Sequence, residues 1–188
     1  MTQPVPGEPA SPSPSATEAS AWNLPNALTV GRIVLVPVVG WLLLADGGSN
    51  AATRYLALGA FIVAAITDKI DGDLARSRGQ VTNFGKIADP IADKALLGMT
   101  FVGLSMLGEV AFGVTALVLS REIGITVMRF VVIRHGVMPA GRGGKLKTMV
   151  QAFALGMLIL PAWTLPFATV WRQAAYAVLV LAVGLTFG

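Results

Sequence analysis

Residues 68–76 read DKIDGDLAR, and residues 85–94 read GKIADPIADK. Each stretch carries a pair of aspartates three or four residues apart, which places the pair on one face of a helix. These four aspartates are Asp68, Asp71, Asp89 and Asp93. Asp73, the third aspartate of the first stretch, breaks this facing pattern and is left out of the site. The connector between the stretches is short, so the two helices can lie antiparallel with their acidic faces together. The sequence therefore predicts a polar pocket lined by four carboxylates.

Four carboxylates in one pocket need cations to remain ionised together. Two like charges about 4 Å apart repel by roughly 4 kcal/mol at an effective dielectric constant near 20. Hard divalent ions such as Mg²⁺ or Mn²⁺ bind oxygen ligands, and pairs of them recur at sites of displacement at phosphorus. The alternative, a solvated acidic turn, does not account for helical spacing on both sides of the turn. We expect two divalent ions, Mg²⁺ or Mn²⁺.

The two stretches together fit one long pattern without a deviation. From Asp68 to Asp93 the chain reads D-x₂-D-G-x₂-A-R-x₈-G-x₃-D-x₃-D. This pattern resembles the signature of the CDP-alcohol phosphatidyltransferase family. The resemblance implies an integral-membrane enzyme, which transfers a phosphatidyl group from a CDP-linked lipid to an alcohol and releases CMP.

The composition is that of a polytopic membrane protein. Of the 188 residues, 54% are hydrophobic and 13% are charged, and the mean hydropathy is +0.70. A soluble chain of this length could not bury so much apolar surface. The chain contains no cysteine, which excludes disulfides and thiol chemistry. In a membrane protein, a net charge of +4 reflects cytoplasmic loops and acidic lipid headgroups, and we expect no nucleic-acid partner.

The chain divides into a polar tail and a membrane domain. Residues 1–20 are rich in Pro, Ser, Ala and Thr, and we expect a disordered tail that is not a signal peptide. Residues 21–188 are expected to form an all-α membrane domain, in which a short N-terminal interfacial helix near Trp22 and Pro25 precedes six transmembrane helices. The expected spans are Thr29–Ala45, Ala52–Ala75, Lys86–Leu107, Val110–Ile133, Leu146–Pro161 and Phe167–Phe187.

Basic residues predict the orientation of these spans. One set of turns holds seven of them, namely Arg76, Arg78, Lys86, Arg134, Arg142, Lys145 and Lys147. Only Arg54 and Arg172 lie near the opposite set. Because positive loops remain in the cytoplasm, we expect a multi-pass protein of the cytoplasmic membrane with both termini and the acidic pocket on the cytoplasmic side. Arg32, early in the first span, is expected to snorkel or to pair with an acidic site.

A second polar group is predicted around the fourth and fifth spans. Arg121 and Arg129 are eight residues apart and therefore share a helix face, and Lys145 and Lys147 follow in a Gly-rich basic segment. Guanidinium and ammonium groups suit a dianionic phosphate. Alternatively, these groups are only topology determinants bound to lipid headgroups. The pattern G-K-x-K-T-x₂-Q at 144–151 resembles the glycerol-3-phosphate branch of the family.

The resemblance implies a role for each matching residue. Asp68, Asp71 and Asp89 would bind metal ions, and Asp93 would complete the site and act as general base. Spacing alone does not decide which of Asp89 and Asp93 is the base. The CDP-lipid would be contacted by Gly72, Ala75, Arg76 and Gly85, although the small residues also suit ordinary helix packing. The acceptor phosphate would be bound by Arg121, Arg129, Lys145 and Lys147.

We therefore expect an enzyme that transfers the phosphatidyl group of CDP-diacylglycerol to glycerol 3-phosphate and is surrounded by membrane lipids. The resemblance also suggests a homodimer. Within the same family, a cardiolipin synthase would use phosphatidylglycerol and another enzyme would use inositol phosphate. A cation- or proton-coupled transporter is the alternative from a different class, since intramembrane carboxylates also mark ion pathways. The acids cluster at one surface, however, and no inverted repeat is evident in the sequence.

Overall fold

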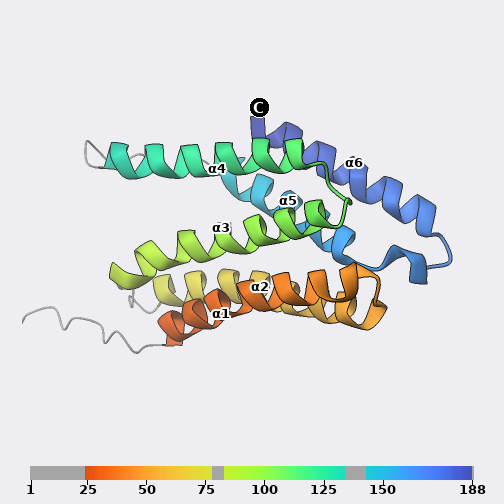
Figure 1. Cartoon of the computed structure of the whole chain (residues 1–188). Helices are drawn as coiled ribbons and strands as arrows, with labels where there is room; N and C mark the ends of the chain where they lie inside the picture. The colour runs from red at the N-terminus through yellow and green to blue at the C-terminus, as the bar shows by residue number, and fades with distance from the viewer. Residues whose placement is uncertain (1–23, 78–82, 134–142, 188) are drawn as a thin grey trace, which may run out of the picture.

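The computed structural model describes the backbone of residues 24–77, 83–133 and 143–187, and the side chains of residues 27–68, 70, 88–128 and 147–186. These ranges are all-α, as the sequence predicted, with helices that alternate in direction (Figure 1). The elements are α1 (Leu24–Leu44), the 3₁₀ turn η1 (Ala45–Gly48), α2 (Ala51–Ser77), α3 (Asn83–Met106), α4 (Phe112–Ile133), α5 (Gly143–Ile159), the 3₁₀ turn η2 (Ala162–Thr164) and α6 (Ala168–Phe187).

The six long helices coincide with the six expected apolar runs, but the N-terminal region differs from the prediction. A separate interfacial helix is not formed by the described residues, since α1 runs without interruption from Leu24 through the first expected span. Proline is compatible with the first turn of a helix, so Pro25 does not separate the two segments. The tail expected at residues 1–20 lies outside the described residues.

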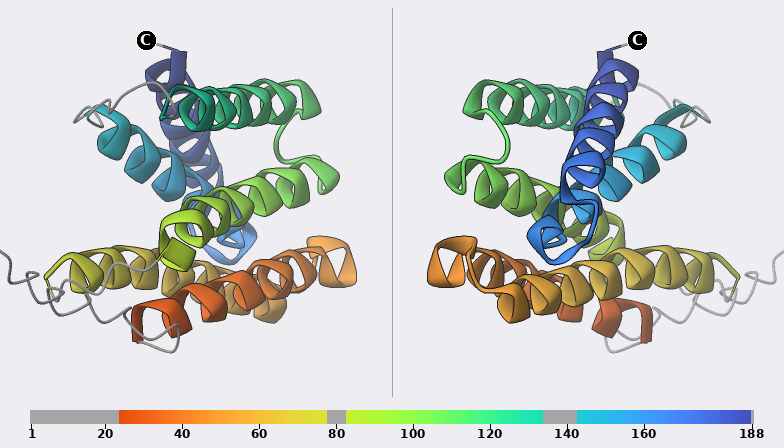
Figure 2. Two further views of the ribbon diagram at one scale, coloured as in Figure 1. Left: turned by 90° about the vertical axis from the view of Figure 1, so that its left-hand side faces the viewer. Right: turned by 90° about the vertical axis from the view of Figure 1, so that its right-hand side faces the viewer.

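The helices pack in layers. α1 and α2 lie side by side, and α3 and α5 lie between this pair and the outer helices α4 and α6 (Figure 2). The buried core runs through all six long helices, with Leu43, Phe61, Phe101 and Leu155 among its large side chains and Leu179 contributed by α6. α4 packs mainly against α3, and α6 packs mainly against α5.

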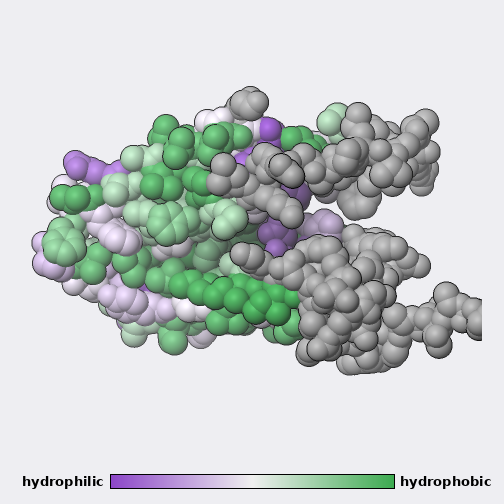
Figure 3. All heavy atoms as spheres, turned by 180° about the vertical axis from the view of Figure 1, so that it is seen from behind, coloured by the Kyte–Doolittle hydropathy of each residue, from purple (hydrophilic) through white to green (hydrophobic). Residues whose placement is uncertain are grey.

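Apolar side chains also cover the outside of the bundle (Figure 3). Trp41 and Val180, for example, are about 70% exposed. Such a surface is expected where hydrocarbon replaces water as the surrounding medium. Among the described residues, three segments are long and apolar enough to cross a membrane: Ala27–Gly48, Ala51–Asp68 and Ala168–Thr186. Charged residues interrupt α3 and α4, and α5 is shorter.

The alternation of direction gathers chemically important segments at one end of the bundle. The beginnings of α1 and α3 and the ends of α2 and α4 lie at the left of Figure 1, and α5 begins nearer the middle of the picture, behind α4. The acidic residues of α2 and α3 and the basic residues of α4 and α5 therefore come together, although they are far apart in the sequence.

Candidate functional site

Helix α1 joins the two acidic helices. Arg32 donates from Nη1 to Oδ1 of Asp68 on α2 at 2.5 Å, and Thr29 donates from Oγ1 to Oδ1 of Asp89 on α3 at 2.6 Å. Thr29 and Arg32 are three residues apart and thus share a face of α1, and both are only 1% exposed. The prediction that Arg32 pairs with an acidic site is confirmed.

Asp93 belongs to the same acidic cluster. It follows Asp89 by about one turn of α3 and is partly buried. The negative charge of Asp68 and the positive charges of Arg32 and Lys94 all act on its carboxylate. Three of the four predicted acids therefore lie at the same end of the bundle, where α1 connects Asp68 of α2 with Asp89 of α3.

The acidic cluster has the donor chemistry of a divalent-metal site. Asp89 accepts a hydrogen bond from the hydroxyl of Thr29 through Oδ1. Carboxylate oxygens are the ligands that Mg²⁺ and Mn²⁺ prefer. Asp71 lies on α2 one turn beyond Asp68, but its side chain is outside the described set. Within that set, no three acidic or histidine groups gather closely enough to enclose a metal.

A second cluster of charges surrounds Glu122 on α4. Lys94 of α3 donates to Oε2 of Glu122 at 2.5 Å, and Lys147 of α5 donates to Oε1. Nη1 of Arg121 lies 3.6 Å from the same Oε1. The side chains of Lys147 and Glu122 are 14% and 15% exposed. One carboxylate thus connects three helices, with three cations around it.

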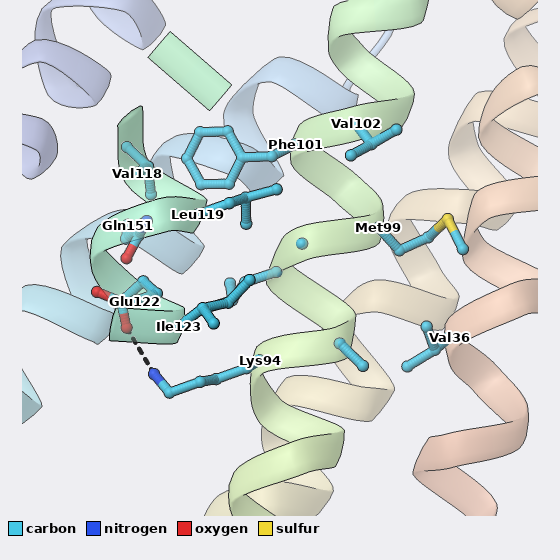
Figure 4. Close-up of a pocket in the computed structure, with 13 residues that line it drawn as sticks. Val36, Lys94, Met99, Phe101, Val102, Val118, Leu119, Glu122, Ile123 and Gln151 are labelled. Atoms are coloured by element: carbon cyan, nitrogen blue, oxygen red, sulfur yellow. Dashed lines mark hydrogen bonds and ion pairs between the residues drawn. The ribbon is translucent and has the colours of Figure 1, made fainter. Parts of the chain in front are cut away.

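An open cavity of about 370 Å³ extends from this second cluster. Its polar end is formed by Lys94, Glu122 and Gln151, and apolar side chains such as Phe101 and Val118 line the remainder (Figure 4). Lys94 points from α3 toward Glu122, with Gln151 beside them. A polar end that continues into an apolar body is the lining expected for an amphiphilic ligand.

For several predicted site residues at the same end of the bundle, the structure describes the backbone but not the side chain. Gly72, Ala75 and Arg76 lie in the last turns of α2, and Gly85 begins α3. Arg129 lies near the end of α4, and Lys145 lies in the first turn of α5. Their roles, like that of Asp71, stay predictions. Of the predicted phosphate ligands, the structure brings Arg121 and Lys147 together.

Three residues of the site received no role from the sequence. Thr29 is a single threonine in an apolar run and carries little signal, although it stands three residues before Arg32. Lys94 directly follows Asp93. Glu122 is a charge within a predicted span, and such charges usually face a cavity or a partner. For Lys94 and Glu122, the tendency of charges within a span to face a cavity or a partner was the available signal.

Comparisons with known proteins agree with this arrangement. The model of the CDP-alcohol phosphatidyltransferase family matches residues 22–188. A probable phosphatidylglycerophosphate synthase of Mycobacterium tuberculosis is 48% identical over 173 residues, which cover 92% of this chain and 83% of the relative. A CDP-diacylglycerol–glycerol-3-phosphate 3-phosphatidyltransferase of Bacillus subtilis is 37% identical, covering 79% of this chain and 81% of the relative. A CMP-forming cardiolipin synthase of Rattus norvegicus is 33% identical, covering 72% and 46%.

Proposed function

Because the chain belongs to the CDP-alcohol phosphatidyltransferase family, we propose that it transfers the phosphatidyl group of CDP-diacylglycerol to glycerol 3-phosphate. The products are phosphatidylglycerol phosphate and CMP. One observation carries this assignment: an acidic cluster at Asp68, Asp89 and Asp93 lies beside a basic cluster that contains Arg121 and Lys147. The first cluster suits a diphosphate donor with its cations, and the second suits an acceptor that carries a phosphomonoester.

Enzymes of this family generally use a divalent metal ion. We assign two ions, Mg²⁺ or Mn²⁺, to the carboxylates of Asp68, Asp71, Asp89 and Asp93. When bound, such ions supply positive charge to the diphosphate and to the leaving CMP. Arg32 and Thr29 hold Asp68 and Asp89 in place from α1, as outer partners of metal ligands commonly do.

The reaction itself is a displacement at phosphorus. The acceptor hydroxyl loses its proton to Asp93, acting as general base, and its oxygen forms a bond to the phosphatidyl phosphorus. The bond from that phosphorus to the bridging oxygen breaks, and CMP leaves with the bonding electrons. Gly72, Ala75, Arg76 and Gly85 contact the CDP part of the donor. The acceptor phosphate is bound by Arg121, Arg129, Lys145 and Lys147.

The orientation and assembly belong to the same proposal. The basic turns support an orientation with the site and both termini on the cytoplasmic side of the cell membrane, where soluble nucleotide and acceptor are found. A homodimer is proposed from the family resemblance. Helix α4 is compatible with one, because it packs mainly against α3 and exposes Leu117, Ile123 and Val127 to a second copy or to lipid.

A cardiolipin synthase is the second candidate, and the similarity to the rat enzyme supports it. That reaction would use the hydroxyl of phosphatidylglycerol, whose phosphodiester carries a single negative charge. The cluster around Glu122 combines three cations with one carboxylate. This excess of positive charge favours an acceptor with a dianionic phosphomonoester.

CMP release by the purified protein tests the assignment. The protein in detergent receives Mg²⁺ and CDP-diacylglycerol, with glycerol 3-phosphate, phosphatidylglycerol or inositol phosphate in parallel. We expect CMP with glycerol 3-phosphate alone. CMP with another acceptor instead would contradict the acceptor assignment and leave the acidic site standing. No CMP with any of the three would contradict the proposed reaction and favour the transporter.

Substitution of Asp93 tests its role as base. Asp93→Asn should lower turnover by roughly 100-fold or more, the usual contribution of a general base, while CDP-diacylglycerol binding is partly retained. The matched control is Asp46→Asn, which alters an exposed aspartate in η1 at the other end of the bundle; this variant should have normal turnover. Equal losses of binding and turnover in Asp93→Asn would contradict the assignment.

A further inference from the structure

Glu122 and Lys94 have no part in the reaction described so far, yet Lys94 directly follows Asp93, and Glu122 contacts both Arg121 and Lys147. Glu122 accepts from Lys94 and from Lys147 through different oxygens, and Arg121 lies beside it. Each lysine comes from a different helix, one from the catalytic helix α3 and the other from α5. The Glu122 side chain is largely buried, so its charge is compensated by these neighbours and not by bulk water.

The charge of the cluster indicates what it is built to receive. Lys94, Arg121 and Lys147 contribute three positive charges and Glu122 contributes one negative charge, so 3 − 1 leaves a net charge of +2. A phosphomonoester close to pH 8 carries about two negative charges and would neutralise the cluster. Before that ligand arrives, the carboxylate of Glu122 is the anion that keeps the ammonium groups together.

We propose that Glu122 is a positioning residue that stands in for the acceptor phosphate. Its carboxylate holds Lys94, Arg121 and Lys147 together in the empty site and releases Lys147 to the phosphate when the acceptor binds. Lys94 is then a further cation of the phosphate site, still paired with Glu122. The identity of the acceptor rests on the proposed function, whereas the chemical class of the ligand, a dianionic phosphomonoester, follows from the cluster itself.

The proposal makes opposite predictions for the two partners of one ion pair. Glu122→Gln raises the net charge of the cluster to +3 and removes the competing carboxylate, so phosphate should bind about tenfold more tightly. Lys94→Gln lowers the net charge to +1, so phosphate should bind about tenfold more weakly. If the pair only held α3 and α4 together, both substitutions would act in the same direction, because both would loosen the same contact.

Inorganic phosphate is the probe, and thermal unfolding of the full chain in detergent is the readout. Phosphate is titrated at about pH 8 against chloride of equal ionic strength, and the concentration that gives half of the rise in Tm is compared between variants. This concentration should fall about tenfold in Glu122→Gln and rise about tenfold in Lys94→Gln relative to the unchanged protein. No CDP-lipid is present, so the result does not depend on turnover.

Glu109→Gln is the matched control for this experiment. Glu109 pairs with Arg54 at 2.8 Å outside the phosphate cluster, so its substitution also removes one buried ion pair. It should lower Tm and leave the phosphate concentration at half-effect unchanged. Midpoints that shift in the same direction in Glu122→Gln and Lys94→Gln, or do not shift, would overturn the proposal. If Glu122→Gln does not fold, an unchanged phosphate concentration at half-effect in Lys94→Gln is enough to overturn the proposal.

Two further arms separate this inference from the proposed function. Glycerol 3-phosphate and a short-chain phosphatidate are titrated in the same assay. Tighter binding of phosphatidate would identify a lipid-headgroup site and overturn the role in acceptor binding. Opposite midpoint shifts, together with CMP release from another phosphorylated alcohol, would support the inference and contradict glycerol 3-phosphate. Normal turnover with glycerol 3-phosphate without the shifts would contradict the inference alone.

Discussion

The hydroxyl of Thr29 makes a hydrogen bond that orients Asp89, a proposed metal ligand. It donates to Asp89 at 2.6 Å from 60 positions away, inside the protein. Thr29→Val keeps a branched side chain and removes the donor. Loss of an outer partner of a metal ligand typically costs 10- to 100-fold. We therefore expect turnover to fall about tenfold or more, and the Mg²⁺ concentration for half-maximal CMP release to rise by a similar factor.

Thr29→Ser is the control for this prediction, because serine retains the hydroxyl while it loses the methyl group. It should restore most of the turnover and the Mg²⁺ dependence. If the valine variant matched the unchanged protein in both measurements, the contact with Asp89 would have no part in the reaction. A Mg²⁺ dependence that fails to recover with serine would mean that the methyl group of Thr29 is needed in addition to the hydroxyl.

The residue scale also shows what sequence spacing can and cannot reveal. The acids on α2 and α3 were found because carboxylates at helical spacing are rare in apolar runs. The pairing of Arg32 was anticipated because a buried charge needs a partner. Thr29 was missed, since a hydroxyl in an apolar helix needs no partner beyond its own backbone. Glu122 is visible in the sequence as a charge within a span, but its two lysine partners lie 28 and 25 residues away.

At the scale of whole helices, apolar runs and the polar turns between them fixed the bounds to within a few residues. The neighbours of each helix were not predictable in the same way, because many apolar faces can pack against each other. The contact of α1 with both α2 and α3 is an example. A separate interfacial helix is not formed within the described residues, because Pro25 is compatible both with a separate segment and with the first turn of a longer helix.

Arg54 is a residue that holds several helices together at the end of the bundle away from the site. Its Nε donates to the carbonyl of Ile159 at 2.9 Å, and its Nη2 donates to that of Leu158 and to Glu109, each at 2.8 Å. The guanidinium also lies over the ring of Trp163, 5.4 Å from its centre. Arg54 therefore connects α2, the end of α5 and the turn between α3 and α4.

We expect Arg54→Met to destabilise the bundle while the chemistry persists. Removing one partner of a buried ion pair costs about 3 kcal/mol or more in free energy of unfolding, so thermal unfolding in detergent should begin at a clearly lower temperature. CMP release per folded molecule should remain normal, because the site lies at the other end. The control is Arg172→Met on α6, an exposed arginine, which should change the free energy of unfolding by less than about 0.5 kcal/mol. Equal effects of the two substitutions would contradict the connecting role of Arg54.

For the whole molecule, the distribution of polarity constrains how it lies in the membrane. The two charged clusters occupy one end, whereas large apolar side chains are exposed along the flanks. Only three of the described helices meet a simple standard of length and hydropathy for crossing. The other three carry the charges of the site or are short, and a protein-lined polar cavity is where such residues are tolerated at membrane depth. Six crossings therefore remain the prediction.

Single cysteines can test this prediction, because the chain has none of its own. Three substitutions of exposed residues mark the end of the bundle opposite the site: Asn50→Cys, Ala111→Cys and Thr169→Cys. A fourth, Ser77→Cys, marks the last residue of α2 at the site end. With six crossings and a cytoplasmic site, a membrane-impermeant maleimide should label the first three in intact cells and Ser77→Cys only after lysis. Labelling of Asn50→Cys without Ala111→Cys would mean that α2 and α3 do not both cross. Labelling of Ser77→Cys in intact cells, with the other three labelled only after lysis, would place the acidic cluster outside the cell, away from cytoplasmic nucleotide. That result would contradict the orientation on which the proposed reaction depends.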